Sequence, residues 1–129
     1  MNNKPFGVKP ANRPLSDEER CLVRWMPEHG SPEARDFLPQ LELAEATPWR
    51  CRCGCASFNF AIDGREAPPG VHVIADFVFG GEDELCGIFV FEKDGILSGL
   101  EVYGLAVDPP SSLPRPESLR PFRPSTAGA

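Results

Sequence analysis

The sequence predicts an α+β fold in which two N-terminal helices pack on a four-stranded antiparallel meander, giving two layers. Three observations carry this prediction. Helix start signals precede apolar stripes between residues 15 and 47, whereas alternating apolar and polar residues follow from Trp49 onward. Asp94-Gly95, flanked by apolar runs, is typical of a two-residue type I′ hairpin turn. Helices that precede a run of strands are expected to cover one face of the resulting sheet.

Two helix starts are visible before residue 48. Ser16 and Glu19 have the spacing of a capping box, in which each side chain bonds to an otherwise unpaired backbone N–H, and Pro27 is expected to end this helix. The second start is Ser31-Pro32-Glu33, a capping hydroxyl followed by a proline and an acid. Pro39 lies inside the second apolar stripe and predicts a kink or break, because proline removes a helical hydrogen bond.

The strands are predicted around Phe58, Phe60 and Ile62, over residues 71–79, and in a hairpin over residues 86–103. Counting outward from the Asp94-Gly95 turn fixes the hairpin register, and a slip of one residue would exchange the two faces. The predicted core face holds Phe89, Phe91, Ile96, Leu100 and Val102. The predicted second face holds Ile88, Val90, Glu92, Leu97, Gly99, Glu101 and Tyr103.

Both ends of the chain are rich in proline. Residues 1–14 are predicted to be a flexible arm, residues 15–108 a single α+β domain, and residues 109–129 a proline-rich extended tail. Six prolines between residues 109 and 124 exclude a helix or an inner strand there. Leu113, Leu119 and Phe122 are the residues expected to attach part of this tail to the domain.

The net charge of −6 is unevenly distributed. Residues 63–108 contain ten acids and only two bases, Arg65 and Lys93. Such a negative field disfavours nucleic acid and anionic membranes and favours a basic protein partner, although solubility alone is an alternative reason for it. No apolar run reaches the ~18 residues of a membrane span and no signal-peptide pattern is seen, so a cytoplasmic location is expected. Five cysteines, an odd number, fit a reducing compartment better than a disulfide framework.

Six residues are predicted to bind the partner. Acids beside an aromatic and aliphatic patch suit a basic protein, because charge steers the encounter and the patch supplies affinity. An ordinary solvated loop is the alternative for the run of three acids. The predicted binding residues are Glu82, Asp83, Glu84, Glu92, Glu101 and Tyr103.

The segment "CRCGCAS" places thiols at Cys51, Cys53 and Cys55. On a strand they share one face at about 6.5–7 Å spacing, too far apart for tetrahedral zinc. Small buried thiols are therefore the first interpretation. The alternative is a metal-binding or redox module, in which Gly54 bends the chain and His72 or Cys86 completes a zinc site.

No reactive constellation is recognisable in the sequence. A catalytic cysteine needs a histidine base, and the two histidines, His29 and His72, are interpreted as a turn residue and a structural strand residue. Nucleophile-elbow, phosphate-loop and metalloprotease motifs are absent. The protein is therefore expected to be no enzyme and to need no cofactor.

Three segments together resemble a known group of proteins. They are "CRCGCAS", "DGILSGLEVYG" and the closing "LPRPESLRPF". The chain resembles small uncharacterised bacterial proteins with a CGC-x-S strand and a G-x-L-x-x-LE-V-Y hairpin, over roughly Leu15 to Phe122. With its acidic α+β domain it also resembles the immunity proteins that protect bacteria from contact-delivered toxins. This resemblance implies a non-enzymatic protein that neutralises a cognate basic toxin.

Overall fold

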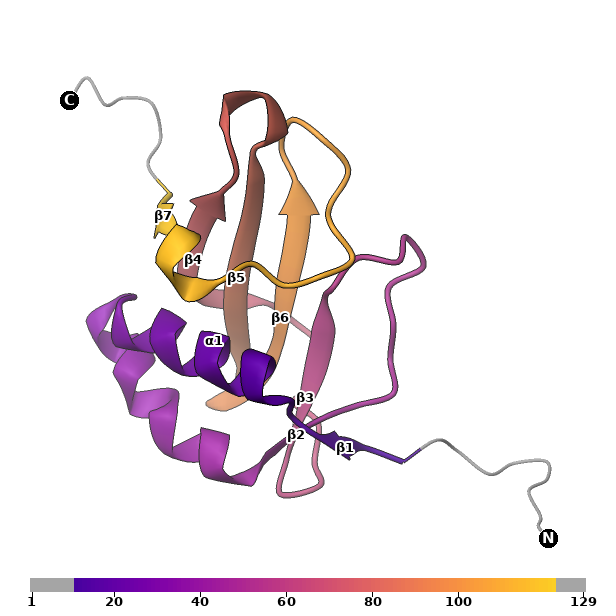
Figure 1. Cartoon of the computed structure of the whole chain (residues 1–129). Helices are drawn as coiled ribbons and strands as arrows, with labels where there is room; N and C mark the ends of the chain where they lie inside the picture. Colours follow the sequence, from indigo (N-terminus) through magenta and orange to yellow (C-terminus); the bar gives the residue numbers. More distant parts are fainter. Residues whose placement is uncertain (1–10, 123–129) are drawn as a thin grey trace, which may run out of the picture.

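Seven antiparallel strands form one sheet, and a helical layer covers one of its faces (Figure 1). The computed structural model describes residues 11–122, to which all structural statements refer. The strand order is β1-β2-β3-β6-β5-β4-β7. The strands are β1 (Arg13–Pro14), β2 (Ala44–Ala46), β3 (Phe58–Ile62), β4 (His72–Phe79), β5 (Cys86–Lys93), β6 (Ile96–Gly104) and β7 (Arg120–Pro121). The helical segments are α1 (Asp17–Glu28) and the 3-10 segments η1 (Pro32–Leu43), η2 (Glu82–Glu84) and η3 (Pro116–Ser118).

The predicted architecture of two helices on a four-stranded meander is wrong. Residues 32–43 form a 3-10 helix, and β3 pairs with β6 rather than with β4. The three strands that were not predicted, β1, β2 and β7, are only two or three residues long. Such short strands, two of them containing proline, carry no alternating pattern, and proline is tolerated at sheet edges. Among the described helices, none has the length and apolar character needed to span a membrane.

Helix α1 begins with the predicted capping box. The Glu19 N–H donates to Ser16 Oγ at 3.1 Å, and the Ser16 N–H donates to Glu19 Oε1 at 2.8 Å. Arg13 on β1 adds two hydrogen bonds of 2.8 Å to the same carboxylate. The start of the helix is therefore tied to the edge of the sheet. The helix ends at Glu28, one residue beyond Pro27.

The segment η1 departs from the prediction in its capping and its geometry. The Ser31 side chain makes no capping bond; its hydroxyl donates instead to the Ile74 carbonyl at 3.2 Å. The segment is 3-10 on both sides of Pro39, where a kinked α-helix was predicted. Gln40 then joins η1 to the hairpin, since its side chain donates to the Gly95 carbonyl and accepts from the Leu97 N–H.

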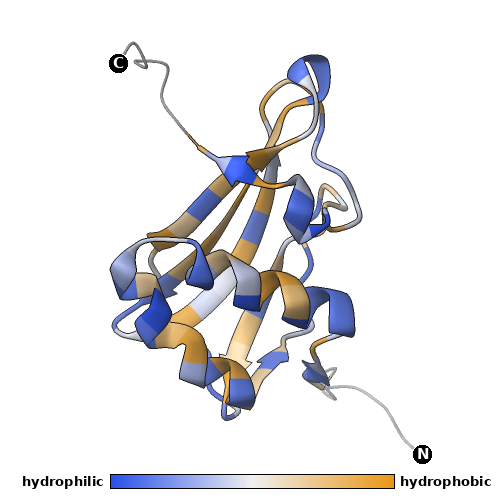
Figure 2. Ribbon diagram, turned by 60° about the vertical axis from the view of Figure 1, so that its left-hand side comes forward, coloured by the Kyte–Doolittle hydropathy of each residue, from blue (hydrophilic) through white to orange (hydrophobic). Residues whose placement is uncertain are grey.

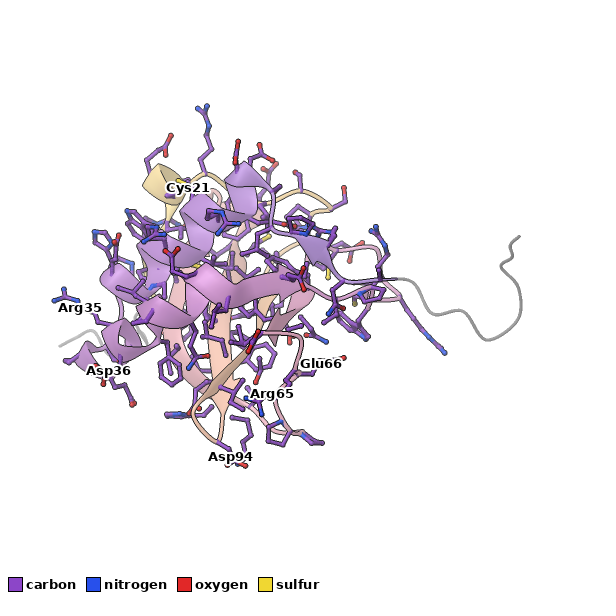
Figure 3. The ribbon with its side chains drawn as sticks, turned by 90° about the horizontal axis from the view of Figure 1, so that it is seen from below. Cys21, Arg35, Asp36, Arg65, Glu66 and Asp94 are labelled. Carbon is purple, nitrogen blue, oxygen red and sulfur yellow. The ribbon has the colours of Figure 1, made fainter. Side chains whose placement is uncertain are left out.

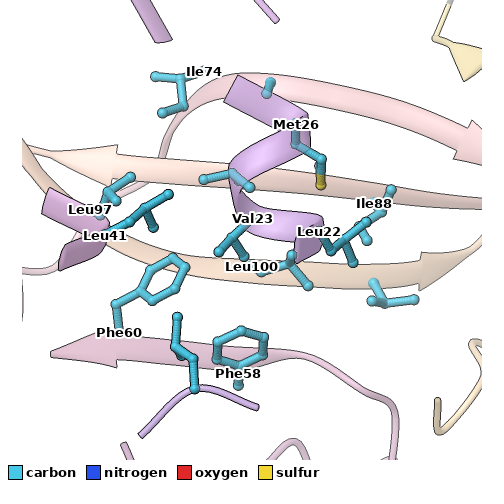
Figure 4. Packing of buried hydrophobic residues seen from close by; sticks show 14 of the residues in the cluster. Leu22, Val23, Met26, Leu41, Phe58, Phe60, Ile74, Ile88, Leu97 and Leu100 are labelled. Atoms are coloured by element: carbon cyan, nitrogen blue, oxygen red, sulfur yellow. The ribbon is translucent and has the colours of Figure 1, made fainter. Parts of the chain in front are cut away.

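The core lies between the helical layer and the inner face of the sheet. Leu22, Val23 and Met26 of α1 are fully buried and project toward the strands, where they meet Ile88 and Leu100 (Figure 4). Figure 2 shows that hydrophobic and hydrophilic residues follow one another along the strands. Phe58 and Phe60, which lie in a strand as predicted, are buried at 4% and 1% exposure.

The hairpin turn forms where it was predicted, but the register of the hairpin is wrong beyond it. Asp94 and Gly95 have φ angles of 52° and 82°, as a type I′ turn requires. Lys93 pairs with Ile96 and Glu92 with Leu97, but Phe91 pairs with Gly99, so Ser98 is left over as a bulge. Because of this bulge, Leu100 and Val102 keep their predicted place in the core but share it with Val90 and Ile88. Leu97, predicted on the second face, is buried as well, at 1% exposure.

The bulge corrects the predicted core face. Ile88 and Val90 are buried at 0% and 1% exposure, whereas Phe89 and Phe91, which were predicted in the core, lie half-buried on the opposite face. A second irregularity in the strand pairing, between Val73 and Ala75, interrupts the alternation of faces along β4. Together the two bulges decide which side chains the sheet presents away from the helices.

The proline-rich segment after β6 returns across the molecule to β4. Its part up to Phe122 lies within the described residues. Leu119 is buried at 8% exposure and Leu113 packs against the core, whereas Phe122 is 43% exposed. Strand β7 pairs with β4 and forms the second edge of the sheet. Residues 1–10 of the predicted arm and 123–129 of the predicted tail lie outside the described residues.

Candidate functional site

The face of the sheet opposite the helical layer carries a compact group of aromatic and acidic side chains. Strand pairing places these residues in three rows: Val73 beside Phe91 and Gly99, Asp76 beside Phe89 and Glu101, and Val78 beside Gly87 and Tyr103. We call this group the outer patch. It consists of Val73, Asp76, Phe89, Phe91, Glu101 and Tyr103.

The three aromatic rings of the outer patch form a continuous stripe. The ring centroids of Phe91 and Phe89 are 5.7 Å apart, and those of Phe89 and Tyr103 are 5.9 Å apart. Two glycines let the outer rings lie down on the sheet: a Cβ on Gly87 would sit 2.2 Å from Tyr103 Cζ, and one on Gly99 would sit 2.9 Å from Phe91 Cζ. All three rings are half-buried, and neighbouring ring planes are tilted by 60° and 56°, so their exposed parts form a continuous but uneven apolar surface.

Two exposed acids flank the aromatic stripe. Asp76 and Glu101 lie on either side of Phe89 in adjacent strands, and both are exposed. Burial raises the pKa of the Tyr103 phenol, and the charges of Asp76 and Glu101 raise it further. The negative potential of the two carboxylates therefore reaches the aromatic stripe.

The six residues predicted to bind a partner do not lie together. Glu101 and Tyr103 belong to the outer patch. Glu82, Asp83 and Glu84 form the exposed segment η2 in the connection between β4 and β5. Figure 3 labels further charged residues outside the outer patch: Arg65 and Glu66 in the loop after β3, and Asp94 in the hairpin turn.

Glu92 occupies a different place from the one predicted. Its carboxylate bonds to the His72 ring and accepts the Gly95 N–H at 2.8 Å, and its side chain is only 12% exposed. Although burial acts in the opposite direction, the hydrogen bonds from His72 and Gly95 hold the pKa of Glu92 below its usual value. Glu92 and His72 thus stabilise the end of the hairpin.

Sequence reasoning missed Val73, Asp76, Phe89 and Phe91 as parts of the outer patch. A signal was present for Asp76 alone, because an aspartate in an otherwise apolar strand favours an exposed position. The bulges reversed the assignment of Phe89 and Phe91, so the aromatic stripe was not recognised.

The cysteine segment forms a second candidate site, and the strand predicted for it is wrong. The sulfur atoms of Cys51, Cys53 and Cys55 all lie within 4.8 Å of one another, and β3 begins only at Phe58. Gly54 has a φ of 82°, and its N–H donates to the Cys51 carbonyl at 3.1 Å. This turn brings together thiols that a strand would have separated.

Hydrogen bonds link the three thiols to one another and to Ser57, the residue before β3. Cys51 Sγ and Cys53 Sγ are 3.0 Å apart, and Cys55 Sγ donates to Ser57 Oγ at 3.2 Å. The pKa of Cys53 is raised to about 11, mainly by its hydrogen bond with the Cys51 thiol and next by its hydrogen bond with the Cys55 thiol. Burial opposes ionisation of Cys55, but its hydrogen bonds with Ser57 and with the neighbouring cysteines together lower its pKa.

The two additional ligands considered from the sequence do not join this cluster. His72 is paired with Glu92, and the Cys86 thiol donates to the Glu84 carbonyl at 3.7 Å. Among residues 11–122, Cys51, Cys53 and Cys55 form the one group of three or more potential ligands. Cys53 is exposed and the other two are half-buried, so these thiols are not the small core residues that were the first interpretation.

Comparison of the chain with protein-family models, with curated proteins and with solved structures found no match.

Proposed function

We propose that this protein is a non-enzymatic binding protein that recognises a basic protein partner through the outer patch. The observation that carries this proposal is the aromatic stripe of Phe89, Phe91 and Tyr103, flanked by the exposed carboxylates of Asp76 and Glu101. In its strongest form, the partner is a cognate basic toxin and the protein is a bacterial immunity protein.

The chemistry of the outer patch suits lysine and arginine side chains. An aromatic face attracts a cation, and the attraction strengthens when the pair is shielded from water. Aromatic residues at the centre of an interface commonly supply most of the affinity, while charges at the rim raise the association rate. Asp76 and Glu101 are placed to pair with cations whose hydrocarbon stems lie on the rings.

The acidic character of the wider sheet region supports the same kind of partner. Ten of the chain's acids fall within residues 63–108, and η2 places three of them at one end of β4 and β5. A field of one sign over a surface steers an oppositely charged protein toward it. The toxin as partner rests on the resemblance of the "CRCGCAS" and "DGILSGLEVYG" segments.

The test is co-expression of the full chain with the product of the adjacent gene, followed by purification at low salt. We expect a complex that weakens as ionic strength rises, because the attraction is electrostatic, and we expect the chain to protect cells from the neighbouring product. Absence of a complex at low salt, together with absence of protection, contradicts the proposed partner.

Two matched charge reversals test the outer patch itself. Glu101→Lys places a cation beside the aromatic stripe and is expected to weaken the complex about tenfold or more, since like charges across an interface are costly. Glu42→Lys makes the same change on η1, where the side chain is 74% exposed, and is expected to leave affinity within about twofold. Equal effects of the two substitutions would show that overall charge, and not the outer patch, attracts the partner.

A further inference from the structure

The loop from Cys51 to Cys55 brings three sulfur atoms to one side of a turn that is exposed to solvent. Each sulfur lies within 4.8 Å of the other two, and the closest pair, Cys51 and Cys53, is 3.0 Å apart. In tetrahedral zinc sites the Zn–S distance is about 2.3 Å, which places sulfurs about 3.8 Å apart. No pair of sulfurs exceeds this value by more than about 1 Å, so small side-chain movements suffice for all three sulfurs to reach one ion.

The backbone around the cysteines is held in place before any ion binds. The Ala56 N–H donates to the Pro110 carbonyl at 3.1 Å, which fixes the loop to the segment that follows β6. The Thr47 N–H donates to the Asn59 carbonyl at 2.9 Å on the other side of the loop. A preformed arrangement of ligands reduces the ordering cost of binding.

The loop geometry also depends on one glycine. Gly54 has a φ of 82°, a conformation that costs a residue with a side chain roughly 1 kcal/mol or more. A Cβ at this position would meet no atom within 4 Å. The requirement for glycine is therefore conformational and not steric, and it serves to fold the three thiols onto one side.

The surroundings leave a fourth coordination position open. Cys55 lies at the border of a hollow of about 740 Å³, whose charged lining residues are Arg13, Arg50, Glu18 and Glu19. Three thiolates around Zn²⁺ carry a net charge of −1; since Arg13 is bound to Glu19, Arg50 is the cation of this lining that would offset it. Thiolates select zinc over the hard cations magnesium and calcium.

We propose that Cys51, Cys53 and Cys55 bind one Zn²⁺ as a three-thiolate site whose fourth position is open to water or to an incoming ligand. Binding releases the thiol protons to solvent and forms three Zn–S bonds, without oxidation or reduction. The site is independent of the outer patch, which lies on strands β4, β5 and β6.

The test measures zinc in the untagged full chain, purified under reducing conditions without chelator. The wild type is expected to hold about one equivalent of zinc, and Cys53→Ser to hold less than about 0.1 equivalent, because removing a ligand from a three-ligand site destroys it. Cys21→Ser removes an exposed thiol from α1 and is the matched control, which is expected to retain full zinc.

Cobalt substitution provides the second measurement. Co²⁺ added to the reduced chain is expected to give the intense sulfur-to-cobalt absorption and the visible bands of a tetrahedral thiolate site, lost in Cys53→Ser and kept in Cys21→Ser. Circular dichroism spectra of both variants establish that they are folded. Zinc-free wild type that also gives no cobalt spectrum after full reduction overturns the proposal, as does equal zinc in wild type and Cys53→Ser.

Discussion

Removing the hydroxyl of Ser57 is expected to destabilise the fold markedly, although Ser57 lies outside every regular strand. Its Oγ accepts the Val102 N–H at 2.8 Å and donates to the Val102 carbonyl at 3.3 Å. The register of β3 with β6 covers only two residue pairs, Phe58 with Leu100 and Asn59 with Gly99. The Ser57 side chain therefore replaces the next strand residue and pairs both backbone groups of a residue that is only 2% exposed.

The magnitude follows from the groups that Ser57→Ala leaves unpaired. A buried backbone group without a partner costs about 1–3 kcal/mol, and the second group, with the longer bond, adds less. We therefore expect a loss of about 2 kcal/mol in the free energy of unfolding, and a fall of roughly 8 °C in Tm for a chain of this size. Urea denaturation of the reduced protein measures the free energy directly.

Ser98→Ala is the matched control for this measurement. Ser98 lies at the bulge of β6, and its hydroxyl donates to the carbonyl of nearby Ile96 at 3.4 Å. Its removal leaves no buried group unpaired and is expected to change stability by less than about 0.5 kcal/mol. If Ser57→Ala also stays within that limit, the hydroxyl does not hold β3 against β6.

Three further predictions concern the capping box and the outer patch. The hydrogen bond from Arg13 lowers the pKa of Glu19 below its ordinary value of 4.5. The ionised Glu19 carboxylate therefore contributes its full stabilisation above pH 4.5, and this stabilisation is lost as the pH falls through the lower pKa of the folded state. Glu19→Gln should thus weaken the acid dependence of the urea midpoint, and an unchanged profile would contradict this. Gly87→Ala should lower the free energy of unfolding by about 1–3 kcal/mol, because the new methyl group overpacks against the Tyr103 ring. In a Tyr103→Ala background most of this loss should disappear, and a double-mutant cycle without coupling would refute the contact. Tyr103 is the sole tyrosine, so ultraviolet titration of the protein reports on this phenol. Its pKa should lie above the ordinary value of 10, and Glu101→Gln should lower the pKa part of the way back toward 10. A pKa at or below 10 in the wild type argues against burial of Tyr103 beside the acids.

Sequence patterns predicted correctly those features of the structure that depend on residues close together in the chain. The capping box of Ser16 and Glu19 is present, Asp94 and Gly95 form the turn, and Phe58 and Phe60 lie in the strand that their alternation with polar residues predicted. Each of these features is decided within a few residues, by a side chain that pairs with a nearby backbone group or by the two-residue period of a strand.

The placement of Phe89 and Phe91 in the outer patch could not be predicted from the sequence pattern. Counting from the turn assumed an unbroken ladder, and one extra residue at Ser98 moved Phe89 and Phe91 from the predicted core to the outer patch. Nothing in the local pattern marks that bulge, because Ser98 is compatible with either face. The aromatic stripe was therefore visible only once the strands were paired.

The sequence by itself determined helix α1, the four longer strands, the position of the hairpin turn and the concentration of acids over residues 63–108. Only the tertiary structure decided the strand order, the faces of β4, β5 and β6, and the convergence of the three thiols in a turn. The physical reason is the range of the interactions. Caps and turns are stabilised by contacts between near neighbours, whereas sheet order, bulges and ligand clusters are selected by the packing of segments far apart in the chain.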